Sequence, residues 1–120
     1  MENYTLGAVE TRFADIIWDN APLTTNELIA LCEKELNWKR TTTYTVLKRL
    51  SNRGIFQKDG KLVSVKIPRE RFYSMQSENY VERAFNGSLP KFLAAFTSER
   101  RLSREEAEEL KRLIDSLSED

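Results

Sequence analysis

A strongly basic segment constrains this chain more than any other feature of its sequence. Residues 38–71 include ten lysines or arginines and two acidic residues, a local charge of +8 in a chain whose formal net charge is zero. Apolar residues at three- and four-residue steps predict a helix over residues 40–53. Gly54 follows directly and suits the position after a helix end. A positive field of this size on a helix is typical of proteins that bind nucleic acid.

A tight hairpin is predicted immediately after the basic helix. Residues 55–58 and 62–67 have the composition of short strands, and the second run alternates apolar with polar side chains. Asp59-Gly60 between them is a strong two-residue turn signal, because glycine accepts positive φ angles. The hairpin carries further lysines, so it can contact the same partner as the helix.

Two helices are predicted before the basic helix. Leu6, Val9, Phe13 and Ile17 follow a helical period over residues 6–20. Thr24 and Glu27 form a capping-box pattern that predicts a second helix over residues 25–36. Three helices followed by a hairpin predict a winged helix-turn-helix domain over residues 1–70, in a chain that is mainly α-helical with a small β-hairpin.

The outer face of the basic helix and the hairpin are the predicted DNA-binding surface. Threonine hydroxyls and methyls can contact bases in the major groove, and lysine and arginine can contact phosphates. Arg49 is ambiguous, since it could contact phosphate or pair internally with an acid such as Glu10. The predicted DNA-binding residues are Lys39, Arg40, Thr41, Thr42, Tyr44, Thr45, Lys48, Arg49, Arg53, Lys58 and Lys61.

Residues 71–120 are predicted to form a helical dimerisation domain. Helical patterns cover residues 69–86 and 89–97, and Ser103 with Glu106 forms a capping box before a last helix. These helices carry many large apolar side chains, which either fold back on the first three helices or pair with a second copy of the chain. The predicted dimer interface comprises Phe85, Leu89, Phe92, Leu93, Phe96, Leu102, Leu110, Leu113, Ile114 and Leu117.

Composition argues against several other functions. The chain has no histidine and one cysteine, Cys32, which falls on the apolar face of the second predicted helix. A Cys/His zinc site and histidine-based catalysis are therefore excluded, and we expect no metal, no cofactor and no enzymatic activity. No apolar run approaches the ~20 residues that span a bilayer. The N-terminus lacks the pattern of a signal peptide, so we expect no membrane insertion and a cytoplasmic location.

The order of these motifs resembles the penicillinase-repressor (BlaI/MecI) family of bacterial transcription regulators over nearly the whole chain. The most specific match is TTTYTVLKRLSNRGIF, which follows the recognition-helix pattern of that family. LGAVETRFADIIW and TTNELIALC are similar to its first two helices. FLAAFTSERRLSREEAEELKRLI is similar to its dimerising C-terminal helices.

The resemblance implies a homodimer that binds palindromic double-stranded operator DNA and represses antibiotic-resistance genes. In better-known members, a membrane sensor that detects β-lactams triggers proteolysis between an asparagine and a phenylalanine. The matching pair here is Ala95-Phe96, so the asparagine of that possible regulatory cleavage region is missing. Copper control is not expected, because the clustered cysteines of a related branch are absent. The alternative function is a winged-helix module that binds protein and not DNA.

Overall fold

The computed structural model describes residues 6–118, which form two compact units. The division in the chain falls between Asn79 and Tyr80. We call residues 6–79 the N-terminal unit and residues 80–118 the C-terminal unit. Helix α4 (Arg69–Phe85) contributes residues to both. Its first turns belong to the N-terminal unit because Phe72 is fully buried in the core of that unit. The predicted division at residue 70 lies before these turns.

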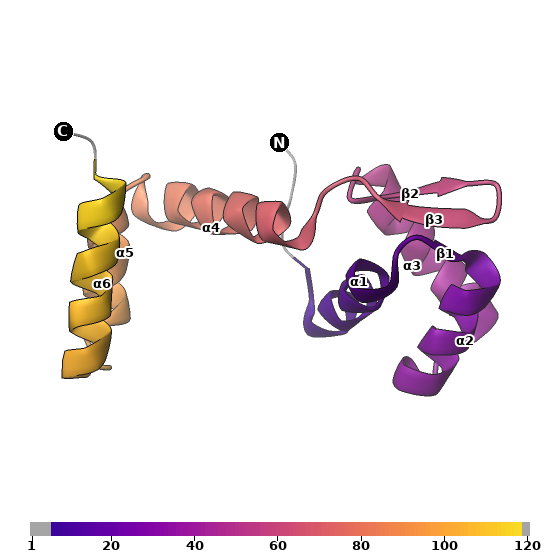
Figure 1. Cartoon of the computed structure of the whole chain (residues 1–120), viewed down its shortest axis with the longest axis horizontal. Coiled ribbons are helices and arrows are strands. Elements are labelled where there is room, and N and C mark those ends of the chain that lie inside the picture. Colours follow the sequence, from indigo (N-terminus) through magenta and orange to yellow (C-terminus); the bar gives the residue numbers. More distant parts are fainter. Residues whose placement is uncertain (1–5, 119–120) are drawn as a thin grey trace. The chain divides into compact units, whose positions relative to one another are not determined.

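The N-terminal unit combines three helices with a small antiparallel sheet (Figure 1). The strand order is β1-β3-β2, so the hairpin strand β3 is central. The elements are α1 (Ala8–Asn20), β1 (Leu23–Thr24), α2 (Thr25–Leu36), α3 (Arg40–Asn52), β2 (Phe56–Asp59) and β3 (Leu62–Val65). Helices and a hairpin in this order make a winged helix-turn-helix fold, which confirms the predicted fold class.

The predicted caps close the helices at their N-terminal ends. The Thr24 hydroxyl accepts the Glu27 amide at 3.1 Å, and the Glu27 carboxylate accepts the Thr24 amide at 2.9 Å. Helix α1 begins at Ala8, two residues after the predicted start. The cause is local, since the Glu10 carboxylate accepts the Gly7 amide at 3.3 Å and places the cap at Gly7.

The sheet differs from its prediction in its strand content, in the position of its turn and in the length of β3, which ends at Val65 and not at residue 67. Strand β1 was not predicted; it pairs Leu23 with Val63 and makes the sheet three-stranded. The hairpin turn lies one residue later than expected, because Asp59 pairs with Leu62 and leaves Gly60 and Lys61 as the loop. Gly60 has a φ of 61° and is the first loop residue, as in a type II′ turn.

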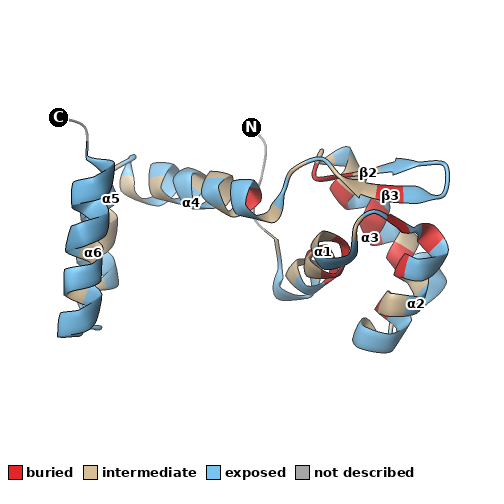
Figure 2. Ribbon diagram, viewed as in Figure 1, coloured by how far each residue is buried: buried red, intermediate tan, exposed pale blue. Residues whose placement is uncertain are grey.

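The hydrophobic core lies between the helices and the sheet of the N-terminal unit (Figure 2). Its fully buried side chains include Phe13 and Ile17 of α1, Leu28 of α2, Leu50 of α3 and Phe56 of β2. These residues fall on the apolar faces that the sequence periodicity predicts. The core therefore fixes which face of α3 remains in contact with solvent.

The C-terminal unit contains the end of α4 together with α5 (Leu89–Phe96) and α6 (Arg104–Leu117). Ser88 caps α5, and Ser103 with Glu106 forms the predicted capping box of α6. None of residues 80–118 is buried, and Figure 2 accordingly shows no red on α5 or α6. None of the helices within residues 6–118 is long and apolar enough to cross a bilayer.

Truncation of Leu50 is expected to destabilise the N-terminal unit strongly. Leu50→Ala should lower the free energy of unfolding by about 2–5 kcal/mol, since it removes a fully buried side chain and leaves a cavity. Leu62→Ala is the matched control, because Leu62 is 47% exposed at the hairpin. Urea unfolding followed by tryptophan fluorescence measures both. Equal losses would contradict the placement of the core.

Candidate nucleic-acid interface

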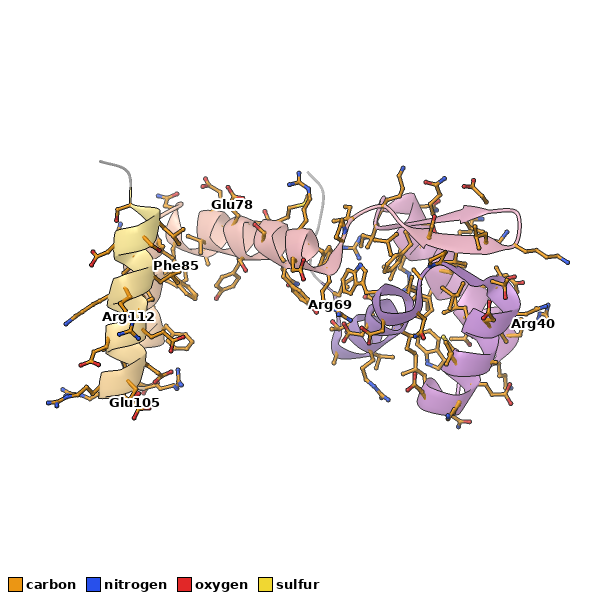
Figure 3. All side chains as sticks on the ribbon, in the orientation of Figure 1. Arg40, Arg69, Glu78, Phe85, Glu105 and Arg112 are labelled. Atoms are coloured by element: carbon orange, nitrogen blue, oxygen red, sulfur yellow. The ribbon has the colours of Figure 1, made fainter. Side chains whose placement is uncertain are left out.

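Helix α3 has a buried face and an exposed, basic face. The buried residues are Thr43, Val46, Leu47 and Leu50. The exposed residues are Arg40, Thr41, Thr42, Thr45, Lys48, Arg49 and Asn52, and all but Asn52 are predicted DNA-binding residues. Figure 3 shows the Arg40 side chain projecting away from the packed interior. Packing of one face against α2 and β2 thus leaves a row of hydroxyls and cations available to a ligand.

Tyr44 is partly buried and connects the start of α3 to α2. A hydrogen bond with the buried Thr25 side chain lowers the pKa of the Tyr44 phenol, and the Arg40 guanidinium and the Lys58 ammonium act in the same direction. The Arg40 guanidinium carbon lies 5.8 Å from the centre of the Tyr44 ring. Helix α3 and the hairpin therefore place two cations around one aromatic side chain.

The hairpin is joined to α2 at its turn. The Thr25 amide donates to the Lys61 carbonyl at 2.9 Å, and β1 pairs with β3 directly before this bond. The side chains of Lys58 and Lys61 remain exposed. Sequence reasoning missed the role of Thr25 at this junction. The capping box places Thr25 at the start of α2. Its contacts with the hairpin and with α3 are tertiary features that no local sequence pattern reveals.

Arg49 pairs with Glu10 in this structure. Its guanidinium donates to the Glu10 carboxylate at 2.9 Å, which joins α3 to α1. Burial opposes ionisation of Glu10, but the Arg49 guanidinium and the Gly7 amide outweigh it, so the pKa of Glu10 lies below its ordinary value. Arg53 adds a further favourable charge. Because the Arg49 side chain is 54% exposed, this pair contributes little to stability, and a phosphate can compete for the guanidinium.

The threonines of α3 are not equivalent. The Thr45 hydroxyl donates to the Thr41 carbonyl at 2.9 Å within the helix. It therefore offers its lone pairs and its methyl group to a ligand, while its proton is already used. Thr41 and Thr42 lie on the exposed first turn, where the backbone amides of the helix end also favour an anion.

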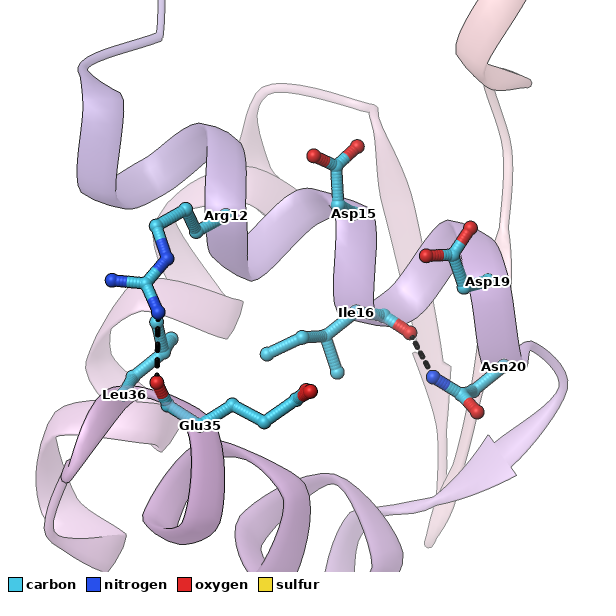
Figure 4. A pocket seen from close by; sticks show the side chains of 7 residues that line it. All are labelled: Arg12, Asp15, Ile16, Asp19, Asn20, Glu35 and Leu36. Carbon is cyan, nitrogen blue, oxygen red and sulfur yellow. Dashed lines mark hydrogen bonds between the residues drawn. The ribbon is translucent and has the colours of Figure 1, made fainter.

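A second concave surface has the opposite charge character (Figure 4). A hollow of about 300 Å³ lies between α1 and the end of α2, where the Arg12 guanidinium donates to the Glu35 carbonyl at 2.8 Å. Its lining residues are Arg12, Asp15, Ile16, Asp19, Asn20, Glu35 and Leu36. Its three carboxylates outnumber the Arg12 guanidinium and the Arg69 guanidinium that bridges Asp15 and Asp19, and this acidic excess disfavours a phosphate backbone. The hollow contains no residue of α3 or the hairpin and does not extend the basic surface.

Cys32 has the environment of a structural thiol. It is fully buried, and burial raises the pKa of Cys32 to about 11, against the smaller opposing influence of the Thr43 hydroxyl. Within residues 6–118, no group of three histidine, cysteine or acidic side chains is placed to hold a metal ion. The single thiol therefore packs between α2 and α3 and provides no reactive group.

Native Cys32 is expected to resist thiol reagents. At pH 8 a group with a pKa of about 11 is only about one part in a thousand thiolate, and the thiolate is the reactive form. Labelling followed by mass spectrometry should be complete only after urea unfolding. Ser74→Cys places an exposed thiol on α4 and should react at once. Since the unfolded thiol ionises near pH ~8.5, this burial stabilises the fold fully below that pH and less as the pH rises toward 11. Rapid native labelling of Cys32 would contradict its burial.

The predicted dimer-interface residues lie in the C-terminal unit and remain largely accessible. Tyr80, Phe85, Phe92 and Phe96 form a chain of ring contacts, with centroid separations of 5.6–6.2 Å. Leu89, Phe96, Leu113, Ile114 and Leu117 are between 47% and 72% exposed. Ala95 is exposed as well, in the last turn of α5. The unit thus brings its aromatic residues together without enclosing them.

Comparison with known proteins gives a consistent result over most of the chain. A family model described as penicillinase repressor matches residues 6–116. The penicillinase repressor of Bacillus licheniformis is 27% identical over 110 residues, which cover 88% of this chain and 86% of that protein. The methicillin resistance regulatory protein MecI of Staphylococcus aureus is 23% identical over 124 residues, which cover 94% of this chain and 95% of that protein.

Proposed function

Because the chain belongs to the penicillinase repressor family, whose members are transcriptional repressors and not enzymes, we propose that it represses transcription by binding palindromic operator DNA as a homodimer. The observation that carries this proposal is the exposed basic face of α3 beside the lysines of the hairpin. Such a face suits the major groove, and a basic hairpin suits the adjacent backbone.

The proposed contacts divide by chemistry. Thr41, Thr42 and Thr45 offer hydroxyls and methyls to base edges, and Tyr44 supports the position of the helix through Thr25. The cations serve phosphates, which fix the position of the protein on DNA but carry no direct sequence information. This second group comprises Lys39, Arg40, Lys48, Arg49, Arg53, Lys58 and Lys61.

The proposed homodimer follows from the lack of burial in the C-terminal unit. Large apolar side chains on α5 and α6 are stable in water only where another surface covers them. A second copy is the most economical cover, since two-fold pairing is the commonest form of association. Two linked reading heads also share the cost of binding and require a palindromic site.

Control of a resistance gene is proposed from the names of the relatives, which are regulators of penicillinase and methicillin resistance. The sequence at the cleavage position argues against relief of repression by a membrane sensor protease, because Ala95 stands where the cleaved members have asparagine. The Ala95 carbonyl also accepts the Ser98 amide at 3.3 Å and the Ser98 hydroxyl at 2.9 Å at the end of α5. A protease would need to unwind this turn. DNA binding in the cytoplasm is part of the same proposal.

Salt dependence and base specificity test the DNA contacts. Lys48→Gln should reduce the slope of log affinity against log salt by about 0.9 per subunit, since one phosphate contact is lost. Lys34→Gln removes the same charge from the exposed end of α2 and should leave the slope unchanged.

Thr42→Ala should weaken binding to the operator by about 1–3 kcal/mol and leave binding to random DNA unchanged. Fluorescence anisotropy on DNA from upstream of the gene measures all three. A flat salt profile would instead favour the protein-binding alternative.

Charged substitutions on α6 test the dimer. Leu110→Glu with Leu113→Glu should yield monomers with weak operator affinity and an intact N-terminal unit, because two carboxylates cannot remain buried in an apolar interface. Arg112→Glu is the matched control: it changes the subunit charge by the same amount on the same helix, away from the apolar face. Analytical ultracentrifugation reports the association state. A doubly substituted protein that stays dimeric would exclude α6 as the interface.

A further inference from the structure

The first residue of α4 makes an unusually dense set of contacts with α1. The Arg69 Nη2 group donates to Asp15 Oδ1 at 3.1 Å and to Asp19 Oδ1 at 2.7 Å, and Nε donates to Asp15 Oδ1 at 3.2 Å. The guanidinium carbon also lies 5.5 Å from the centre of the Trp18 ring. One side chain therefore bridges two carboxylates and covers an indole, all within the N-terminal unit.

These contacts belong to a larger attachment of α4. The Trp18 indole donates to the Ile67 carbonyl at 3.0 Å, directly before the helix begins. Its ring lies 5.6 Å from Phe72 and 5.9 Å from Tyr73 in the first turn of α4. The helix start is thus held both by ring contacts with Trp18 and by the ion pairs of Arg69.

The ion pairs of Arg69 restrict the orientation of α4 more than they stabilise the folded state. Asp15 and Asp19 are four residues apart on α1, where like charges repel unless a cation lies between them. The three side chains are 38–60% exposed, and solvated ion pairs of this kind add little to the free energy of unfolding. The planar guanidinium, however, can satisfy both carboxylates in only a narrow range of orientations. It therefore restricts rotation of α4 about its aromatic attachment.

We propose that Arg69 is a positioning residue that sets the direction in which α4 leaves the N-terminal unit, and thereby the half-site spacing that the dimer accepts. This inference rests on the proposed function, because spacing has meaning only for two linked heads on DNA. Helix α4 is one continuous helix whose residues from Tyr80 onward belong to the C-terminal unit, so a restriction on its first turns acts on the segment that joins the two units. Adding one base pair moves a half-site by about 3.4 Å and turns it by about 35°, so the tolerance for spacing should depend on how strongly Arg69 restricts the direction of α4.

The test compares palindromes whose half-sites are one or two base pairs closer or farther apart. Wild-type affinity should fall about tenfold for each added or removed base pair, because the second head no longer reaches its site. In Arg69→Met the fall in affinity per base pair should be about threefold or less. Its affinity for an isolated half-site should change only by the small amount expected from the loss of one positive charge. Arg71→Met is the matched control, since Arg71 is exposed two residues along the same helix.

A second variant separates the effect of losing the bridge between Arg69 and the two aspartates from the effect of changing the net charge. Asp15→Asn with Asp19→Asn removes the same bridge from its other side and should flatten the spacing profile as Arg69→Met does. It should raise affinity for random DNA, whereas Arg69→Met should lower it, because the two variants change net charge in opposite directions. Thermal unfolding and ultracentrifugation establish that the variants are folded and dimeric.

The outcomes distinguish the two proposals. Folded, dimeric Arg69→Met protein with the wild-type spacing profile would overturn the inference, as would equal flattening by Arg71→Met. If Arg69→Met fails to fold, the double asparagine variant decides alone by the same criterion. Wild-type protein that binds no palindrome and no half-site rejects the proposed function, and the inference with it, before any variant is compared.

Discussion

The indole of Trp18 joins parts of the N-terminal unit that are distant in the sequence. Its ring lies 5.6 Å from Phe56 of the hairpin and 5.6 Å from Phe72 of α4. Its nitrogen bonds the carbonyl of Ile67, so both its apolar body and its polar edge are satisfied. The placement of the hairpin beside α3 depends on this junction, as does the attachment of α4. A basic surface built from two elements requires that both be fixed to the same centre.

The two units use apolar side chains differently. In the N-terminal unit they are enclosed, and the enclosure determines which residues of α3 face solvent. In the C-terminal unit the rings of Phe85 and Phe92 contact one another at 5.6 Å, yet neither is buried. One unit completes its own core, and the other presents an apolar surface that suits a partner. This contrast agrees with the charge division of the chain, whose basic segment lies entirely in the N-terminal unit.

Local signals predicted most of the fold. The capping residues Thr24 and Ser103 marked helix starts correctly because side chain and backbone meet within four residues. Strand β1 was missed because two residues carry no periodicity, and its existence depends on pairing with β3. The exposed face of α3 was predictable from its apolar stripe. The pairing of Arg49 with Glu10 was one of two alternatives that the sequence left open, and the structure contains this pair. The hydrogen bond between Thr25 and Tyr44 was not predicted, since it joins segments whose crossing only the tertiary packing decides.

No residue of the C-terminal unit is buried, so the stability of this unit should depend on the concentration of the protein. Under the proposed pairing, association is part of folding, so the ordered population rises with concentration. Monomers without a partner would expose their aromatic side chains and become substrates of chaperones and proteases. The protein present in the cell would then consist mainly of dimers, because monomers would be degraded.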